Sequence, residues 1–403
     1  MDHAREFRLR GMPRLDLVTA GESHGPKLTG IVSGLPAGLR IDAAAVQADL
    51  ARRQHGYGRG GRMKIEKDTA FFTGGLRGGE TLGGPVAFEI ANLDYAVWER
   101  AMGPLEVEAG AAAKRRLSSP RPGHADLAGG LKYGRRDLRD VLERASARES
   151  AARVAAGALC RQLLLELDIR VKSGVLSIGD VRCPEPPEGF SFADLGNVDE
   201  TSPFRAVDPS VEPAMKAAVD AAAAAGDTLG GTILVGACGV PAGLGSHVSW
   251  DAKLDGRIAQ ALTSIPSVKG VSLGAAVANA FRPGSRAHDP IAWSAARGFF
   301  RTSNRAGGLE GGITNGEDLL VTLYQKPIST LREGLPSVDI DTKQPHRAQY
   351  ERSDVTAVPA CGVIAEAMLA FVLADALLEK TGGDSMDEVK RNFEGFVRAQ
   401  RAY

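Results

Sequence analysis

GGLRGGETLG at residues 74–83 returns as GGLEGGITNG at residues 307–316, which gives the shared pattern G-G-L-x-G-G-x-T-x-G. Each copy comes just before a segment that alternates like a β-strand, at residues 85–90 and 319–324. A match of this length, in the same place relative to a strand, indicates a repeated structural unit. The repeat therefore provides the first guide to the fold.

Two further pairs of motifs follow the same order along the chain. GLPAGL at residues 34–39 returns as GVPAGL at residues 239–244, each after an apolar strand and before a predicted helix. Arg144-Ala-Ser146 precedes a predicted helix at residues 147–168, and Arg352-Ser-Asp354 precedes one at residues 359–380. Three matched pairs predict a duplicated unit, at about residues 14–225 and 226–385.

The helices predicted at residues 147–168 and 359–380 are apolar around most of their circumference. A helix at the surface shows a polar face, so these two are predicted to be central. Alternating segments such as the predicted hairpin at residues 15–33 would form antiparallel sheets outside them. We expect an α+β fold: a β-α-β sandwich with internally duplicated halves and central helices between antiparallel sheets.

The predicted organisation is one domain at residues 14–385 with a flanking segment at each end. Residues 1–13 are a charged N-terminal leader, and residues 386–403 are a C-terminal tail with the pattern of an amphipathic helix. The leader has no apolar core of the secretory type. The apolar run at residues 361–378 is interrupted by Glu366 and Asp375, which favours a buried helix over a membrane span.

Charge is balanced over the whole chain but concentrated locally. The 403 residues hold 49 Lys+Arg and 49 Asp+Glu, so the formal net charge is zero, which argues against a general polyanion binder. Arginines cluster at residues 52–62 and 115–148. This pattern favours a small anionic ligand in a pocket. An Arg/Gly-rich RNA-binding protein is the alternative, disfavoured because only 5% of residues are aromatic and available for base stacking.

The four cysteines are widely spaced and form no metal-binding or redox motif. We expect buried thiols in a reducing compartment, hence a cytoplasmic protein with no metal site.

Residues 121–150 hold the densest cluster of chemically capable side chains. The segment begins as a Pro- and Gly-containing loop around His124, and it ends at Ser146 and Glu149, which have the spacing of a helix capping box. A helix start beside arginines is suited to an anion. An ordinary capped helix with solvated arginines is the alternative that this cluster alone leaves open.

Two glycine-flanked histidines, His24 and His124, are candidate general acids for a reaction with an anionic leaving group, with Asp126 placed to orient His124. A loop histidine is more often idle, because this side chain titrates in many settings. The Gly-rich loop at residues 56–61 is predicted to be a mobile basic lid, and Lys326-Pro-Ile-Ser-Thr330 offers a phosphate contact.

With these motifs in hand, the chain resembles the chorismate synthase family. The resemblance rests on Gly21-Glu-Ser-His-Gly25, Arg121-Pro-Gly-His-Ala-Asp126, the 144–149 segment, the 304–312 segment and Lys326–Thr330. It implies anti-1,4-elimination of phosphate from 5-enolpyruvylshikimate 3-phosphate to give chorismate, with reduced FMN required and no net redox. It also implies a duplicated sandwich fold and a homotetramer. The substrate's two carboxylates and phosphate suit the local arginine clusters.

The resemblance also implies roles for individual residues. His24 and His124 would be acid–base histidines, one near the leaving phosphate and one near the flavin, and Asp354 would assist proton removal through the flavin N5. The positions that would bind the substrate, or NADPH, are Arg53, Arg59 and Arg148. The positions that would bind FMN are Arg144, Ala145, Ser146, Pro266, Ser267, Gly311, Lys326, Pro327, Ile328, Ser329, Thr330 and Arg352.

Some positions depart from the family pattern. Ser150 stands where threonine is usual, and Gln54-His55 replace further Arg or Leu in many members. Pro266 has no backbone N–H, which makes Ser267 the better flavin contact. Because no reductase domain is appended, an external flavin reductase is expected to supply reduced FMN, with NADPH a doubtful ligand here. A catalytically inactive homologue is the remaining alternative, which only an assay excludes.

Overall fold

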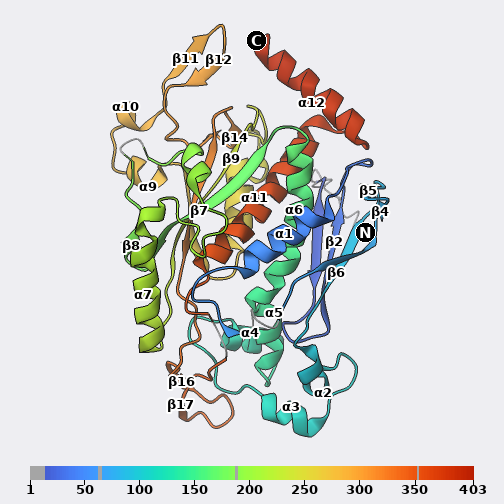
Figure 1. The fold of residues 1–403 in the computed structure, drawn as a ribbon, viewed down its shortest axis with the longest axis vertical. Helices are drawn as coiled ribbons and strands as arrows, with labels where there is room; N and C mark the ends of the chain where they lie inside the picture. The colour runs from blue at the N-terminus through green and yellow to red at the C-terminus, as the bar shows by residue number, and fades with distance from the viewer. Residues whose placement is uncertain (1–13, 62–65, 187–188, 352–353) are drawn as a thin grey trace, which may run out of the picture.

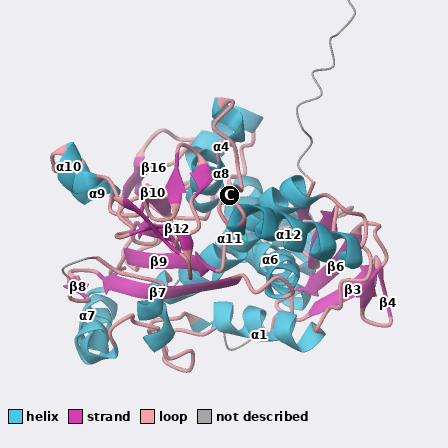
Figure 2. Cartoon of the chain, turned by 90° about the horizontal axis from the view of Figure 1, so that it is seen from above, coloured by secondary structure: helices cyan, strands magenta, loops and turns pink. Residues whose placement is uncertain are grey.

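The computed structural model describes residues 14–61, 66–186, 189–351 and 354–403. The predicted leader lies outside these residues. Two antiparallel sheets flank a layer of helices, an arrangement visible from the side in Figure 1 and from above in Figure 2. The fold is therefore α+β, as predicted.

The first sheet has the order β1-β2-β6-β3 and is antiparallel throughout. Its strands are β1 (Asp16–Ala20), β2 (Lys27–Ser33), β3 (Ala70–Gly74) and β6 (Val86–Ala91). Side chains alternate along β2 and β6, so that Leu28, Val32 and Phe88 are buried against the helices. The β1–β2 pair is the predicted hairpin, and its turn carries His24.

The second sheet has the order β10-β15-β9-β7-β8. Its strands are β7 (Arg170–Ile178), β8 (Val181–Arg182), β9 (Gly231–Cys238), β10 (Val268–Leu273) and β15 (Leu319–Gln325). Most residues of β7 and β9 are buried, because α11 (Val358–Thr381) packs on the sheet and α7 (Glu212–Ala225) also contacts β7.

The central layer is formed by α6 (Ser150–Leu165) and α11, which cross each other. Helix α6 packs against β2 and β6, whereas α11 packs against β7 and β9. By length and composition α11 could span a membrane, but 89% of its most apolar window is buried inside the protein. The prediction of two buried central helices is confirmed, although α6 is shorter than predicted at both ends: a 3-10 turn precedes it, and Asp168 after it adopts a positive φ of 59°.

The other helices lie around this centre. They are α1 (Ala43–Gln54), α2 (Glu99–Met102), α3 (Ala109–Arg115), α4 (Asp126–Tyr133), α5 (Arg139–Ala145), α8 (Leu254–Thr263), α9 (Ala276–Asn279), α10 (Gly284–Ala287) and α12 (Met386–Arg401). Short 3-10 helices are η2 (Tyr95–Val97), η3 (Ala147–Glu149), η4 (Ala193–Asn197), η5 (Pro209–Val211) and η6 (Trp250–Ala252). The predicted amphipathic tail is α12, which packs against α11.

Four small hairpins complete the description. They are β4 (Leu76–Arg77) with β5 (Glu80–Thr81), β11 (Ile291–Ser294) with β12 (Gly298–Arg301), β13 (Leu309–Glu310) with β14 (Ile313–Thr314), and β16 (Pro336–Val338) with β17 (Pro345–Arg347).

The two copies of the glycine-rich pattern fold alike, as β4–β5 and β13–β14. In each copy the threonine hydroxyl donates to the proline carbonyl of the G-x-P-A-G-L loop and accepts from the N–H of its last leucine. The bonds are Thr81 Oγ1 to Pro36 O at 2.6 Å, Leu39 N to Thr81 Oγ1 at 2.9 Å, Thr314 Oγ1 to Pro241 O at 2.7 Å and Leu244 N to Thr314 Oγ1 at 2.8 Å.

Candidate active site

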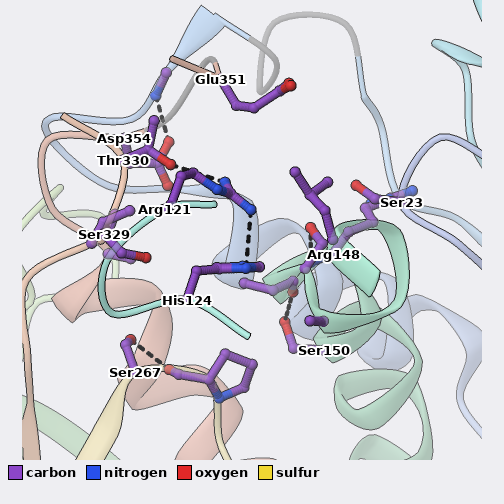
Figure 3. A pocket seen from close by; sticks show the side chains of 18 of the residues that line it. Ser23, Arg121, His124, Arg148, Ser150, Ser267, Ser329, Thr330, Glu351 and Asp354 are labelled. Atoms are coloured by element: carbon purple, nitrogen blue, oxygen red, sulfur yellow. Dashed lines mark hydrogen bonds between the residues drawn. The ribbon is translucent and has the colours of Figure 1, made fainter. Parts of the chain in front are cut away.

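A cavity of about 610 Å³ lies at the ends of the central helices, where both sheets contribute loops. Figure 3 shows its lining side chains converging from these separate segments. Most of the predicted site residues line it: His24, Arg53, Arg59, His124, Ala145, Ser146, Arg148, Pro266, Ser267, Lys326, Ile328, Ser329, Thr330 and Asp354. The fold thus brings together residues from both halves of the sequence.

Three predicted residues do not line the cavity. The Arg144 guanidinium instead donates to the carbonyls of Thr19 at 2.9 Å and Gly21 at 3.3 Å, which ties α5 to the β1–β2 hairpin. Gly311 lies in the turn between β13 and β14, and Pro327 lies between two lining residues without lining the cavity itself. Arg352 lies outside the described residues.

His24 is held on one side by a buried carboxylate. Its Nδ1 lies 2.9 Å and 3.0 Å from the two Glu143 oxygens, and its backbone N–H donates to Glu143 Oε2 at 2.7 Å. Burial disfavours charge on Glu143, yet the hydrogen bonds from His24 hold the pKa of this carboxyl below its ordinary value. Glu143 is therefore an ionised acceptor for His24.

His124 is held in a similar way. Its Nδ1 lies 2.5 Å from Asp126 Oδ1, as expected from the spacing of the two residues. Arg121 donates to both Asp126 oxygens and to Thr330 Oγ1 at 3.0 Å, and Figure 3 shows it between His124 and Thr330. Although burial acts against it, these bonds hold the pKa of Asp126 well below its usual range. Arg121 thereby joins the His124 loop to the Lys326–Thr330 segment.

Arg53 and Arg148 share one buried carboxylate, Asp68. Arg53 Nη2 lies 2.5 Å from Asp68, and Arg148 contacts Asp68 and donates to Asn92 at 2.8 Å. Burial lowers the pKa of Arg53 despite the attraction of Asp68. Among the described residues, Arg53 Nε is buried without a hydrogen-bond partner. Arg148 also pairs with the buried Glu66 at 3.6 Å, so what this cluster offers to an anion is the Arg53 N–H that has no partner in the described ranges.

The glycine-rich loop at residues 56–61, predicted to be a basic lid, is docked on the protein and brings Arg59, Gly60 and Gly61 to the cavity. Tyr57 donates to Asp220 at 2.6 Å, and Val355 N–H donates to the Gly58 carbonyl at 2.8 Å. The loop holds Asp354 from two sides, because Arg59 pairs with it at 2.6 Å and Gly60 N–H donates to it at 2.6 Å.

The predicted capping box at Ser146 and Glu149 does not form. Ser146 caps η3 by accepting from Arg148 N–H at 3.3 Å, while Glu149 pairs with Arg153 at 3.0 Å. A 3-10 turn lies between Ser146 and the start of α6. The Glu149 side chain is therefore not placed to accept from the Ser146 backbone N–H, as a capping box requires. The capping box that is present joins Ser385 and Glu388 at the start of α12.

Part of the cavity wall is apolar, with Ile265, Ile328 and Ile364 among its lining residues. Gln325 adds a buried amide oxygen, Oε1, that has no hydrogen-bond partner among the described residues. Lys326 lies at the edge of this wall, where burial and the nearby Lys269 lower its pKa. This wall suits a flat ring that carries polar groups on its rim.

Arg115 and Arg139 of the predicted arginine cluster line the cavity without having been assigned a role, and sequence reasoning missed Trp98 and Glu351, together with Glu143 behind His24. The His24 ring stacks on Trp98 with ring centroids 3.9 Å apart, and the guanidinium carbon of Arg115 lies 4.0 Å from the centroid of the Trp98 ring. Trp98 lies outside every motif, so no local pattern identified it. Across the described ranges, no cluster of three or more potential metal ligands is found.

Comparisons with known proteins agree on one family. A family model described as chorismate synthase matches residues 15–378. Chorismate synthase of Symbiobacterium thermophilum is 54% identical over 383 residues, covering 94% of this chain and 98% of that protein. The Aquifex aeolicus protein of the same name is 49% identical, covering 96% and 99%.

A solved structure titled "Crystal Structure of Chorismate Synthase" matches with a TM-score of 0.77 and 41% identity, covering 96% of this chain and 99% of that one.

Proposed function

The chain belongs to the chorismate synthase family, and on that premise we propose how its cavity serves the reaction. The family's activity is a carbon–oxygen lyase reaction: anti-1,4-elimination of phosphate from 5-enolpyruvylshikimate 3-phosphate to chorismate, in the shikimate pathway of aromatic amino acid biosynthesis. One observation carries the proposal. Two carboxylate-held histidines face one cavity that is lined by arginines.

The arginine side of the cavity is proposed to bind the anionic substrate. Arg53, Arg59 and Arg148 are the groups assigned to it, and the buried Arg53 Nε gains a partner when an anion binds. His24 is assigned to protonation of the leaving phosphate, because general acids stabilise charge that develops on a leaving group. Asp354, held by Arg59 and Gly60, is assigned to assist removal of the ring proton.

The apolar side of the cavity fits a flavin ring. A cavity of about 610 Å³ is within the usual range for organic ligands, and Gln325 Oε1 offers an acceptor to a ring N–H. We assign reduced FMN, held by Lys326 to Thr330, Ser267, Ala145 and Ser146, with His124 beside it. When bound, reduced FMN supplies the electron-rich ring that this elimination needs without net redox.

Binding of reduced FMN by the Lys326 segment is tested by an anaerobic titration. Lys326→Ala should weaken reduced-FMN affinity by about tenfold or more, the usual effect of losing a charge-assisted contact. Lys390→Ala is the matched control, because Lys390 pairs with Glu166 on the surface. An unchanged Kd in Lys326→Ala would remove this residue from the flavin site. If NADPH displaces the substrate from the wild type, this result would support the alternative in which Arg53, Arg59 and Arg148 bind NADPH.

We also propose a homotetramer. Gly311, which the family resemblance assigns to the flavin, lies outside the cavity of its own chain, so a second copy would have to bring this turn to the site. Exposed apolar side chains on the first sheet, including Val18 and Phe71, would be covered in such an assembly. Sedimentation showing only monomers under assay conditions would contradict it. An external reductase that supplies reduced FMN, in the cytoplasm, completes the proposal.

Internal duplication is proposed for the single domain at residues 14–385. Its support is the shared order of the two sheets, β1-β2-β6-β3 and β7-β9-β15-β10, together with the matched threonine bonds. In this correspondence β7 takes the place of β1. The second unit would then begin near Arg170, instead of residue 226 as the sequence motifs suggested.

A further inference from the structure

The imidazole of His24 is fixed by side chains that come from elements distant in the sequence. Its ring lies on the turn between β1 and β2, whereas Glu143 belongs to α5 and Trp98 follows η2. The His24 side chain is 11% exposed and the Glu143 side chain is fully buried. A fully buried carboxylate needs partners for its charge, and here His24 supplies two of them.

The hydrogen bonds to Glu143 define what His24 can do with its protons. An ionised carboxylate only accepts hydrogen bonds, so His24 Nδ1, at 2.9 Å and 3.0 Å from its oxygens, must carry a proton. Arg139 donates to Glu143 Oε1 at 3.2 Å and pairs with Glu351 at 2.6 Å, which helps to keep the carboxylate ionised. Proton exchange with a ligand in the cavity is then directed to Nε2.

The plane of the ring is fixed separately. Trp98 is 4% exposed and stacks on His24 with ring centroids 3.9 Å apart and planes 25° from parallel. Its indole N–H donates to Asp94 at 3.3 Å, and the guanidinium of Arg115 lies 4.0 Å from the indole ring. The imidazole therefore has a rigid support on one face, which limits rotation about its side-chain bonds.

We propose that Glu143 and Trp98 are positioning residues for His24: Glu143 fixes the tautomer with a proton on Nδ1, and Trp98 fixes the ring plane, so that Nε2 is the proton donor. The inference rests on the proposed role of His24 as the acid. The donor step is balanced, because Nε2 gives its proton to the departing phosphate oxygen as the carbon–oxygen bond breaks, and the imidazole is left neutral with Nδ1–H.

The charged groups that bear on this histidine come from several elements. They are Glu143 and Arg139 on α5, Arg115 on α3, and Arg121 and His124 on the loop before α4, and all of them except Glu143 line the cavity. Of these, Glu143 is the carboxylate bonded to His24 Nδ1. Replacing Glu143 by the neutral isostere glutamine should therefore change the tautomer of His24 more than removing any other single charge in this group.

Nitrogen-15 NMR of the full chain with labelled histidine tests the tautomer directly, with a His24→Gln sample used to assign the signal. The proposal predicts that Nδ1 stays protonated in both charge states of His24, with Nε2 alone losing its proton as the pH rises. A neutral His24 with its proton on Nε2 would overturn the proposal, and this measurement needs no variant of Glu143.

Kinetics under anaerobic conditions with reduced FMN test the consequence. Glu143→Gln should lower kcat by about ten- to a hundredfold, less than the loss of a general acid itself, with a smaller change in KM. In a His24→Ala background the same change should have little further effect, because its target is gone. Trp98→Leu should also lower kcat, by a smaller factor than Glu143→Gln, and should likewise have little further effect in the His24→Ala background.

Glu149→Gln is the matched control, since Glu149 is a buried carboxylate nearby that pairs with Arg153 and does not line the cavity. If Glu143→Gln lowers kcat by the same factor in the wild type and in the His24→Ala background, the positioning role would be overturned. Full activity of His24→Ala alone would instead overturn the role of His24 as the acid, so that the two failures are distinguishable.

Discussion

Glu366 is a carboxylate in the middle of the core, on the central helix α11, and is 1% exposed. It accepts from Ser173 N–H at 2.9 Å on β7, from Arg52 on α1 at 2.8 Å and from Arg205 at 2.9 Å. Burial favours the neutral acid, but the surrounding arginines hold the pKa of Glu366 at about 2, below its ordinary 4.5. This residue therefore balances a buried cluster of positive charge.

The lowered pKa of Glu366 predicts that the folded protein loses stability in acid. Because its pKa is lower in the folded chain than in the unfolded one, its stabilisation is complete above pH 4.5 and is lost as the pH falls towards 2. Glu366→Gln should cost about 3–5 kcal/mol near neutral pH, since it removes the buried charge on which Arg52 and Arg205 converge and leaves them only the more exposed Asp49 and Glu200. It should also flatten the fall of unfolding free energy over this acid range, measured by urea denaturation. A variant that keeps the wild-type pH dependence would contradict this account.

Residues that lie close in sequence were predictable, whereas partners from distant segments were not. Asp126 is two residues from His124, and its role in orienting that histidine was visible in the sequence. Glu143 is separated from His24 by a gap of 119 residues, so only the packing of α5 against the β1–β2 turn reveals the pair. Arg144 was assigned to the flavin, but the fold directs its side chain to the carbonyls of the hairpin.

The crossing of α6 and α11 depends on one glycine. A Cβ added to Gly157 would lie 2.4 Å from Ala367 Cα and 2.5 Å from its carbonyl oxygen. The backbones of the two central helices therefore approach too closely for any side chain at this position. The crossing in turn sets the relative position of the first and second sheets, because each helix packs on one of them.

Gly157→Ala should destabilise the protein although alanine is the better helix former. The gain in helix propensity is about 1 kcal/mol, but forcing the helices apart costs about 1–3 kcal/mol or more, because the clash is with backbone. Thermal unfolding should show a lower Tm. Gly395→Ala on α12 is the control, because its added Cβ meets no atom within 4 Å and should be neutral or mildly stabilising. Equal Tm values for the two variants would contradict the close crossing.

The periodicity of apolar residues predicted which helices exist better than it predicted where each helix begins and ends. The apolar circumference of residues 359–380 was sufficient to place α11 in the centre. The start of α6 was misassigned, because a capping box and a 3-10 turn place a serine and a glutamate at the same spacing. Within this turn Arg148 pairs with Asp68, a residue from a distant segment that no local pattern contains.

Over the whole molecule, the cavity exists because segments far apart in the sequence meet at the ends of α6 and α11. The β1–β2 turn, the loop before α4, the end of β15 and the residues before α11 each contribute to its lining. The site residues implied by the family resemblance already came from both halves of the sequence. Which residues line the cavity, and which lie outside it as Gly311 does, is set by packing that a single sequence does not specify.

The central claim is that this cavity performs the phosphate elimination with His24 and His124 as its proton-handling groups. The most direct test is chorismate formation from 5-enolpyruvylshikimate 3-phosphate by the purified full chain, under anaerobic conditions with chemically reduced FMN. We predict turnover by the wild type and a fall of about two to four orders of magnitude in His24→Ala and in His124→Ala. Folded protein that forms no chorismate, or histidine variants with full activity, would contradict the account.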